Sequence, residues 1–156
     1  MIIPISNEEF SNKVQIKFNN ILDGFDNFKN FTLEFNNEDD FISYIENIFL
    51  DNNSECYFDF YINKLTEKEI DNIINLYKED DKKTLLELID LAKAHRKVYF
   101  KLKSKELIPL LTRLSTREIF FITFYFTKRP ITIWGNYNMK FPCFTLNNED
   151  LNYYAP

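Results

Sequence analysis

Glycine is nearly absent from this chain of 156 residues, which contains only Gly24 and Gly135. A P-loop and a GxGxxG turn both need several glycines, because the backbone must approach phosphate groups closely. The sequence therefore excludes nucleotide binding by either of these routes.

Metal-ligating side chains are also scarce, since the chain has one histidine, His95, and two cysteines, Cys56 and Cys143. These three residues cannot complete a structural zinc site unless carboxylates join them from elsewhere in the fold. The cysteines lie far apart without a CxxC spacing, and the simplest interpretation is that both are free and buried. The sequence predicts no metal site and no cofactor.

His95 is the only candidate for a histidine base. It falls near the end of a predicted helix, beside Arg96 and Lys97, where a positive charge complements the helix dipole and can cap the last carbonyls. Nothing in the sequence brings a cysteine to it. We therefore predict a capping role for His95 and predict no catalytic residue.

Long apolar runs are missing as well. The longest, residues 119–126, is interrupted by Thr123 and is far shorter than the roughly 20 residues that span a bilayer. No basic segment followed by an apolar one marks a secretory signal at the start. The sequence predicts a soluble cytoplasmic protein in which residues 1–156 form a single compact domain.

Aromatic residues are abundant, with 17 Phe, nine Tyr and one Trp making up 17% of the chain. Aromatic side chains bury a large area each, so a core built from them is well stabilised without disulfides or metal ions.

Several segments alternate between apolar and polar residues and are predicted to be strands: residues 14–18, 31–35, 56–62 and 98–102. The first of these is ambiguous, because the residues just before it could open a helix. In the segment 56–62, Asp59 lies on the opposite face from Phe58 and Phe60. We therefore expect Asp59 to point towards solvent or a partner.

Helical spacing of apolar residues predicts helices over residues 38–50, 66–77 and 80–95. Thr66 and Glu69 form a capping box at the start of the second helix. A shorter helix follows Ser104, although Pro109 within it argues for a kink or an end.

Two signals conflict before the C-terminal region, because a capping pattern at 115–118 predicts a helix while the apolar residues 119–126 favour a strand. We prefer the strand. Residues 131–146 predict a β-hairpin with Gly135-Asn136 as its turn. The predicted class is α+β, with a mixed, mainly antiparallel sheet of about five strands, helices packed on one face, and a C-terminal β-hairpin.

Charge is distributed unevenly along the chain. Residues 1–60 hold twelve acids and three lysines, a net charge of −9, while residues 96–140 hold ten bases and two acids, a net charge of +8. Three interpretations are open: the two regions neutralise each other within the fold, the acidic region meets a basic protein, or the basic region meets nucleic acid. A pI near 5.0 disfavours the third.

These features favour a non-catalytic protein that inhibits a basic partner, such as a toxin or nuclease, in the manner of an immunity protein or antitoxin. The predicted contact residues are six acids and two aromatics near the hairpin turn: Glu38, Asp39, Asp40, Asp51, Glu55, Asp59, Trp134 and Tyr137. No membrane or nucleic-acid partner is expected, and a homo-oligomer stays open. The alternative is a carboxylate-based enzyme or a nucleic-acid-processing factor that uses the basic residues 96–140.

Overall fold

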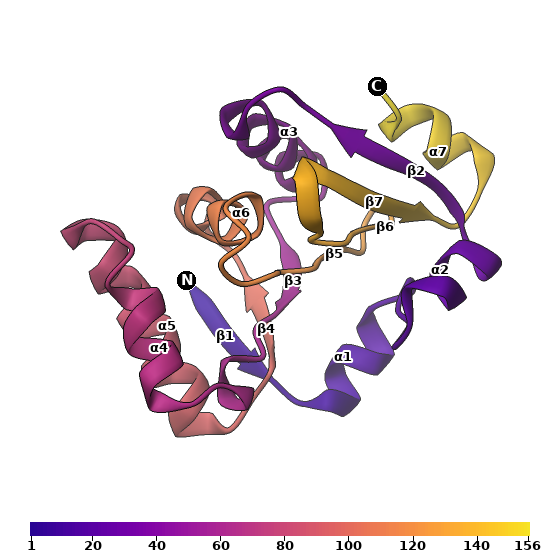
Figure 1. Cartoon of the computed structure of the whole chain (residues 1–156). Coiled ribbons are helices and arrows are strands. Elements are labelled where there is room, and N and C mark those ends of the chain that lie inside the picture. Colours follow the sequence, from indigo (N-terminus) through magenta and orange to yellow (C-terminus); the bar gives the residue numbers. More distant parts are fainter.

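The computed structural model describes residues 1–156 and contains a seven-stranded sheet in which all neighbouring strands are antiparallel (Figure 1). The strands are β1 (Ile2–Ile5), β2 (Lys29–Glu34), β3 (Cys56–Asp59), β4 (Tyr99–Leu102), β5 (Phe124–Phe126), β6 (Ile131–Ile133) and β7 (Lys140–Thr145). Their order in the sheet is β1-β4-β3-β5-β6-β7-β2. The α+β class is confirmed, but the sheet has seven strands rather than about five, and β1, which pairs with β4 at one edge, was not among the strands predicted from the sequence.

Seven α-helices and three short 3-10 turns connect the strands. The helices are α1 (Asn7–Lys13), α2 (Ile21–Asn27), α3 (Glu38–Asp51), α4 (Glu67–Ile74), α5 (Glu79–His95), α6 (Ile108–Thr116) and α7 (Asn148–Tyr154). The 3-10 turns are Ile62–Lys64, Lys105–Leu107 and Tyr137–Met139. The capping box of Thr66 and Glu69 is present at the start of α4, as predicted. No helix combines the length and the apolar character needed to cross a bilayer.

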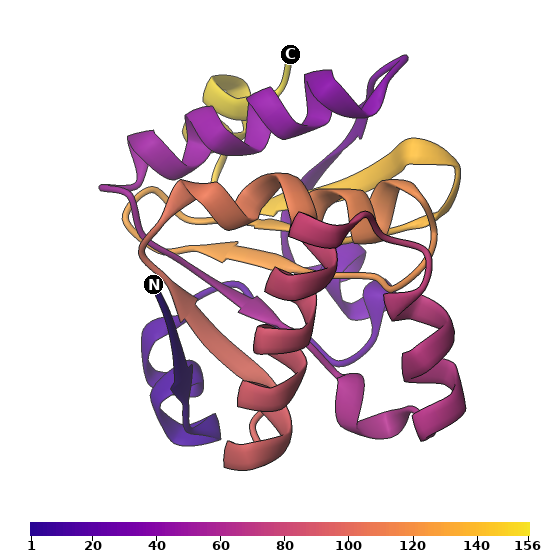
Figure 2. The ribbon, with the colours of Figure 1, turned by 90° about the vertical axis from the view of Figure 1, so that its left-hand side faces the viewer.

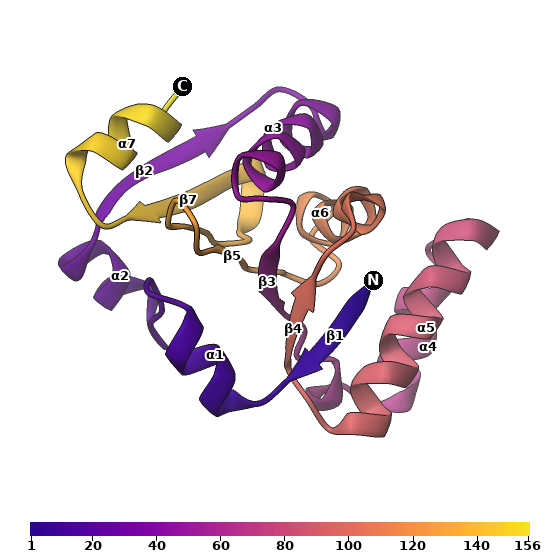
Figure 3. The ribbon, with the colours of Figure 1, turned by 180° about the vertical axis from the view of Figure 1, so that it is seen from behind.

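The helices lie on both faces of the sheet. We call the face that carries Phe58 and Phe100 the first face, and the face that carries Tyr57 and Asp59 the second face. Helices α3, α4, α5 and α6 cover the first face, which Figure 2 views from the front. Helices α1 and α2 lie on the other side, as Figures 1 and 3 show. The prediction that the helices pack on one face is therefore correct for α3, α4, α5 and α6 and wrong for α1 and α2.

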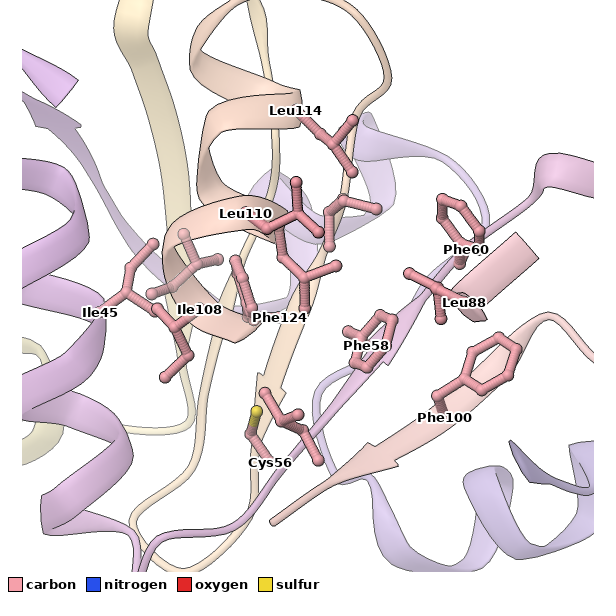
Figure 4. Packing of buried hydrophobic residues seen from close by; sticks show 14 of the residues in the cluster. Ile45, Cys56, Phe58, Phe60, Leu88, Phe100, Ile108, Leu110, Leu114 and Phe124 are labelled. Carbon is pink, nitrogen blue, oxygen red and sulfur yellow. The ribbon is translucent and has the colours of Figure 1, made fainter. Parts of the chain in front are cut away.

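The main hydrophobic core fills the space between the first face and its helices (Figure 4). The side chains that meet there come from α3, β3 and the residue after it, α5, β4, α6 and β5: Ile45, Cys56, Phe58, Phe60, Leu88, Phe100, Ile108, Leu110, Leu114 and Phe124. Cys56 and Cys143 are both free and buried, as predicted. A smaller cluster on the second face joins α1 to the sheet through Phe10, Val14 and Tyr125.

Residues 14–18 form no strand, which corrects the prediction. Their alternation is genuine, since Val14 and Ile16 are buried, but side chains rather than a backbone ladder hold the segment. The Thr132 hydroxyl donates to the Ile16 carbonyl at 2.7 Å, and the Gln15 amide donates to the Thr127 carbonyl at 3.1 Å. The segment therefore lies along the second face beside β5 and β6.

Two further predictions are corrected near the C-terminus. Pro109 stands in the first turn of α6, where its missing N–H has no partner to lose, so it begins the helix rather than ending one. Strands β6 and β7 do pair as a hairpin, but six residues including a 3-10 turn connect them instead of a two-residue turn at Gly135-Asn136. The strand preferred for residues 119–126 is present over Phe124–Phe126.

Gly135 is needed for close packing inside this hairpin. A Cβ atom there would lie 2.6 Å from the carbonyl oxygen of Ile122 and 2.7 Å from Oγ of Ser115. Ser115 Oγ also accepts a hydrogen bond from the backbone N–H of Ile122, so these atoms cannot move apart freely. We expect Gly135→Ala to lower the free energy of unfolding by about 2 kcal/mol, the usual cost of forcing an extra carbon into a packed site.

Urea denaturation checks this expectation, with Gly24→Ala for comparison. The three atoms nearest to a Cβ at Gly24 all belong to the Phe18 ring, and the far end of a side chain can shift more readily than a backbone carbonyl. Gly24 also lies in α2, where alanine is the better helix former. The Gly24 variant should lose less stability, and equal losses would contradict the explanation.

Candidate functional site

The register of the central strands brings polar aromatic side chains around Asp59 on the second face. Asp59 of β3 is paired with Tyr99 of β4, and Tyr57 is paired with Tyr125 of β5. Side chains alternate along each strand, so Asp59, Tyr99 and Tyr125 share one face. The central strands therefore place one carboxyl group among phenol rings.

Two hydrogen bonds hold the carboxylate of Asp59. The backbone N–H of Thr123 donates to Oδ1 at 3.0 Å, and the Tyr125 hydroxyl donates to Oδ2 at 2.9 Å. Burial and the negative charge of Asp59 raise the pKa of Tyr125 well above its ordinary value of 10. Tyr125 therefore keeps its proton at neutral pH and remains a donor to Asp59.

Asp59 is the one acidic residue that the fold buries, with 7% of its surface exposed. The sequence expectation that it points to solvent is wrong, because α1 and the segment 14–19 cover the second face. Burial raises the pKa of Asp59 to about 6 from its ordinary value of 3.8, although the hydrogen bonds from Thr123 and Tyr125 act to lower it. None of the seven ion pairs of the chain includes Asp59. Its charge thus has no cationic partner within the protein.

A pocket of about 720 Å3 opens beside Asp59. We call it the Asp59 pocket. Its walls comprise aromatic rings from α1, β4, β5 and the loops, together with two lysines and three small polar side chains near α1: Phe10, Phe18, Tyr61, Tyr99, Tyr125, Trp134, Lys17, Lys64, Asn7, Ser11 and Asn19. Aromatic walls around a few polar groups are typical of binding sites for small groups.

Stacking orders one wall of this pocket. The Phe10 ring lies flat against Tyr99, with centroids 3.7 Å apart, and meets Tyr125 edge-on at 4.9 Å. The hydroxyls of Tyr61 and Tyr99 are 3.1 Å apart and share a hydrogen bond. The Lys64 ammonium lies 4.5 Å from the centroid of the Tyr61 ring. Phe10 therefore covers a face of Tyr99, while the Tyr61 face attracts the Lys64 ammonium.

Trp134 belongs to the opposite wall. Its indole stacks on Phe18 at 5.3 Å, and the side chain is half-buried. Of the two aromatics predicted at the hairpin tip, Tyr137 is the exposed one, at 58%, and its ring meets Phe121 edge-on. The structure thus brings Trp134 and Asp59 to the same pocket and leaves Tyr137 outside it.

Several of the acids predicted to face a partner are engaged within the fold. Arg117 binds Glu38 through two hydrogen bonds of 2.8 and 3.2 Å, and this contact holds the pKa of Glu38 below its ordinary value. Glu55 pairs with Lys101 at 3.2 Å. Asp51 accepts a hydrogen bond from the Tyr153 hydroxyl.

Asp39, Asp40 and Asp51 are exposed and make no ion pair, but Asp51 is hydrogen bonded to Tyr153, which leaves Asp39 and Asp40 as the freer pair. They lie in the first turn of α3, whose 14 residues extend about 20 Å, so Asp51 stands at the far end. Helix α3 packs on the first face, whereas Asp59 points to the second. The eight predicted residues therefore do not form one continuous surface.

The basic region is also largely neutralised by internal ion pairs. Six of its ten bases pair with acids: Lys101, Lys103, Arg113, Arg117, Arg129 and Lys140. Three of the acidic partners, Glu34, Glu38 and Glu55, come from the first 60 residues. These pairs favour the interpretation in which the two charged regions meet within the fold.

Sequence reasoning missed most of the pocket. The predicted alternation over residues 56–62 places Tyr61 on the same side as Asp59, and that was the available signal. The contributions of Phe10, Phe18 and Tyr99 depend on how α1 and the following segment cross the sheet. His95 ends α5 and is exposed, apart from the pocket. No three His, Cys, Asp or Glu side chains gather where they could hold a metal ion.

The fold and the pocket define an α+β protein with a charged group enclosed by aromatic walls. Comparison of the chain with protein families, with curated proteins and with solved structures gave no match.

Proposed function

We propose that this protein is a non-catalytic inhibitor or antidote that binds and neutralises a basic protein partner in the cytoplasm, in the manner of an immunity protein or antitoxin. The observation that carries the proposal is the position of Asp59: a buried carboxylate without a cationic partner, reached by a pocket whose wall includes Trp134. Unpaired buried charges are costly, and a positively charged group from a partner would remove that cost.

The formal net charge of −5 supports the same proposal. Long-range attraction between an acidic protein and a basic partner speeds their encounter, while buried contacts determine how long the complex lasts. Asp39 and Asp40 are suited to the first role because they are exposed. Asp59 and Trp134 are suited to the second.

Affinity capture of the tagged protein from its native host, followed by binding kinetics with the purified captured protein, tests the proposal. We expect a partner of net positive charge whose own activity falls when the complex forms. Asp59→Asn and Trp134→Ala should speed dissociation about tenfold or more, as residues at the centre of an interface do. A partner whose activity is unchanged in the complex would refute the inhibitor proposal.

Charge reversal on α3 is expected to act on association instead. The double variant Asp39→Lys, Asp40→Lys should slow association several-fold at low salt, with a smaller effect at 0.5 M salt where charges are screened. The pair Asp71→Lys, Glu79→Lys on α4 and α5 changes the net charge equally and serves as the control. Equal slowing by both pairs would mean that overall charge, rather than the α3 surface, steers the partner.

One observation favours a second candidate, a carboxylate-based enzyme. A carboxyl group with a pKa near 6 that lies beside tyrosine hydroxyls is suited to general acid–base chemistry. Under this alternative, Asp59→Asn binds substrate normally and loses turnover, whereas under the binding proposal it loses affinity. The nucleic-acid alternative has less support, because most bases of residues 96–140 are engaged in ion pairs.

A further inference from the structure

The Asp59 carboxylate can accept more hydrogen bonds than the protein supplies. Each carboxylate oxygen has two acceptor positions; the Thr123 N–H donates to Oδ1 and the Tyr125 hydroxyl to Oδ2, and the Thr123 hydroxyl also lies near the carboxylate. The direct contacts from Thr123 N–H and Tyr125 leave acceptor capacity for a ligand. The two oxygens of a carboxylate can accept side by side from a planar group that carries two N–H donors.

The neighbouring wall favours the same shape and charge. Tyr61 and Tyr99 present rings beside Asp59, and the Lys64 ammonium already lies over the Tyr61 ring. The other lysine of the pocket, Lys17, donates to the Val14 carbonyl at 2.7 Å. Phe10 covers a face of Tyr99, whereas the Tyr61 face attracts positive charge, and a flat cation that takes the place of the Lys64 ammonium can stack on Tyr61 while its edge reaches the carboxylate.

We propose that the Asp59 pocket binds a guanidinium group, presented as an arginine side chain of the basic partner, which pairs through two N–H donors with Asp59 and stacks on the Tyr61 ring. This inference rests on the proposed function for the source of the arginine. A guanidinium fits better than an ammonium group because it is planar, carries its donors in a fixed fork and is less strongly hydrated.

Trp134 can report ligand binding through its fluorescence, since it is the only tryptophan and lines the pocket. The probe is N-acetyl-arginine amide, which has the side chain and no charged termini. Its small size predicts a dissociation constant on the order of 1 mM. Titration should give a saturable change in Trp134 fluorescence. The matched citrulline compound, which has nearly the same shape and no charge, should bind at least tenfold more weakly.

Three variants locate the binding. Asp59→Asn removes the charge at nearly constant shape and should weaken probe binding at least tenfold. Lys64→Ala removes the cation that lies over Tyr61 and should tighten binding about twofold or more. Asp71→Asn, at an exposed position in α4 on the opposite face of the sheet, should leave binding unchanged. Far-UV circular dichroism and urea unfolding establish that each variant is folded.

The inference is overturned if no saturable change occurs up to 50 mM probe, if citrulline binds equally well, or if folded Asp59→Asn binds as the wild type does. Its failure is distinct from failure of the proposed function. If the probe binds but affinity capture yields no protein partner, only the proposed function is refuted. A partner bound equally well by wild type and Asp59→Asn would refute only the arginine contact.

Discussion

Replacing Asp59 by Asn is expected to raise the free energy of unfolding by about 3 kcal/mol at pH 7.5 and to change it little below pH 4. In the folded protein the pKa of Asp59 is about 6, above its ordinary value of 3.8 in an unfolded chain. Protonated Asp59 is thus favoured by folding. Its stabilising contribution is complete below pH 3.8 and is lost as the pH rises through 6, and each pKa unit corresponds to about 1.4 kcal/mol.

Urea denaturation of both proteins at pH 4 and pH 7.5 measures this difference. Asparagine can still accept the Thr123 hydrogen bond, so the substitution removes mainly the charge. Asp71→Asn, at an exposed position in α4, is the control, and its effect should stay within about 0.5 kcal/mol at both pH values. If Asp59→Asn proved less stable than the wild type at pH 7.5, the buried charge would have to be stabilised by the protein itself.

An Asp59→Asn variant that is more stable than the wild type would agree with a functional role for Asp59. A group that lowers stability in the isolated protein serves a purpose when a ligand supplies the missing charge. A bound guanidinium should lower the pKa of Asp59, and this change links the stability measurement to the binding measurement.

Replacing Asn52 by Ala is expected to lower the free energy of unfolding by about 3 kcal/mol or more. Asn52 is fully buried, and its side chain connects α3 to two distant segments. Its Nδ2 donates to the Ile48 carbonyl and to the Tyr154 hydroxyl, while Oδ1 accepts from the backbone N–H groups of Lys128 and Arg129. Alanine leaves these groups without their partner, and each unsatisfied buried polar group costs about 1–3 kcal/mol.

Urea denaturation at constant pH measures this loss, and Asn47→Ala provides the control. Asn47 lies in the same helix but is exposed, so its replacement should change stability by no more than about 0.5 kcal/mol. A loss below 1 kcal/mol for Asn52→Ala would indicate that water replaces the lost contacts. Asn52 was not singled out from the sequence, where it reads as part of an Asn doublet in a turn.

The elements that were predicted well are those whose signals are local. Helix α3 was recognised from apolar residues three and four positions apart, and α4 from the capping box of Thr66 and Glu69. The alternation of β3 separated Phe58 from Asp59 correctly. These patterns arise from hydrogen bonds and side-chain periods that span only a few residues, so the sequence by itself determined them.

The candidate site, in contrast, was decided by the tertiary structure. Whether Asp59 meets solvent depends on α1, whose Phe10 packs against Tyr99 and Tyr125 from a distant part of the chain. Likewise, the opposite charges of the two chain regions became internal ion pairs such as Glu38 with Arg117. The sequence determined the α+β class, the main helices and the face on which Asp59 lies. Only the packing of distant segments across the sheet decided that this carboxyl is buried in an aromatic pocket, because burial depends on what covers a residue and periodicity reports only which way it points.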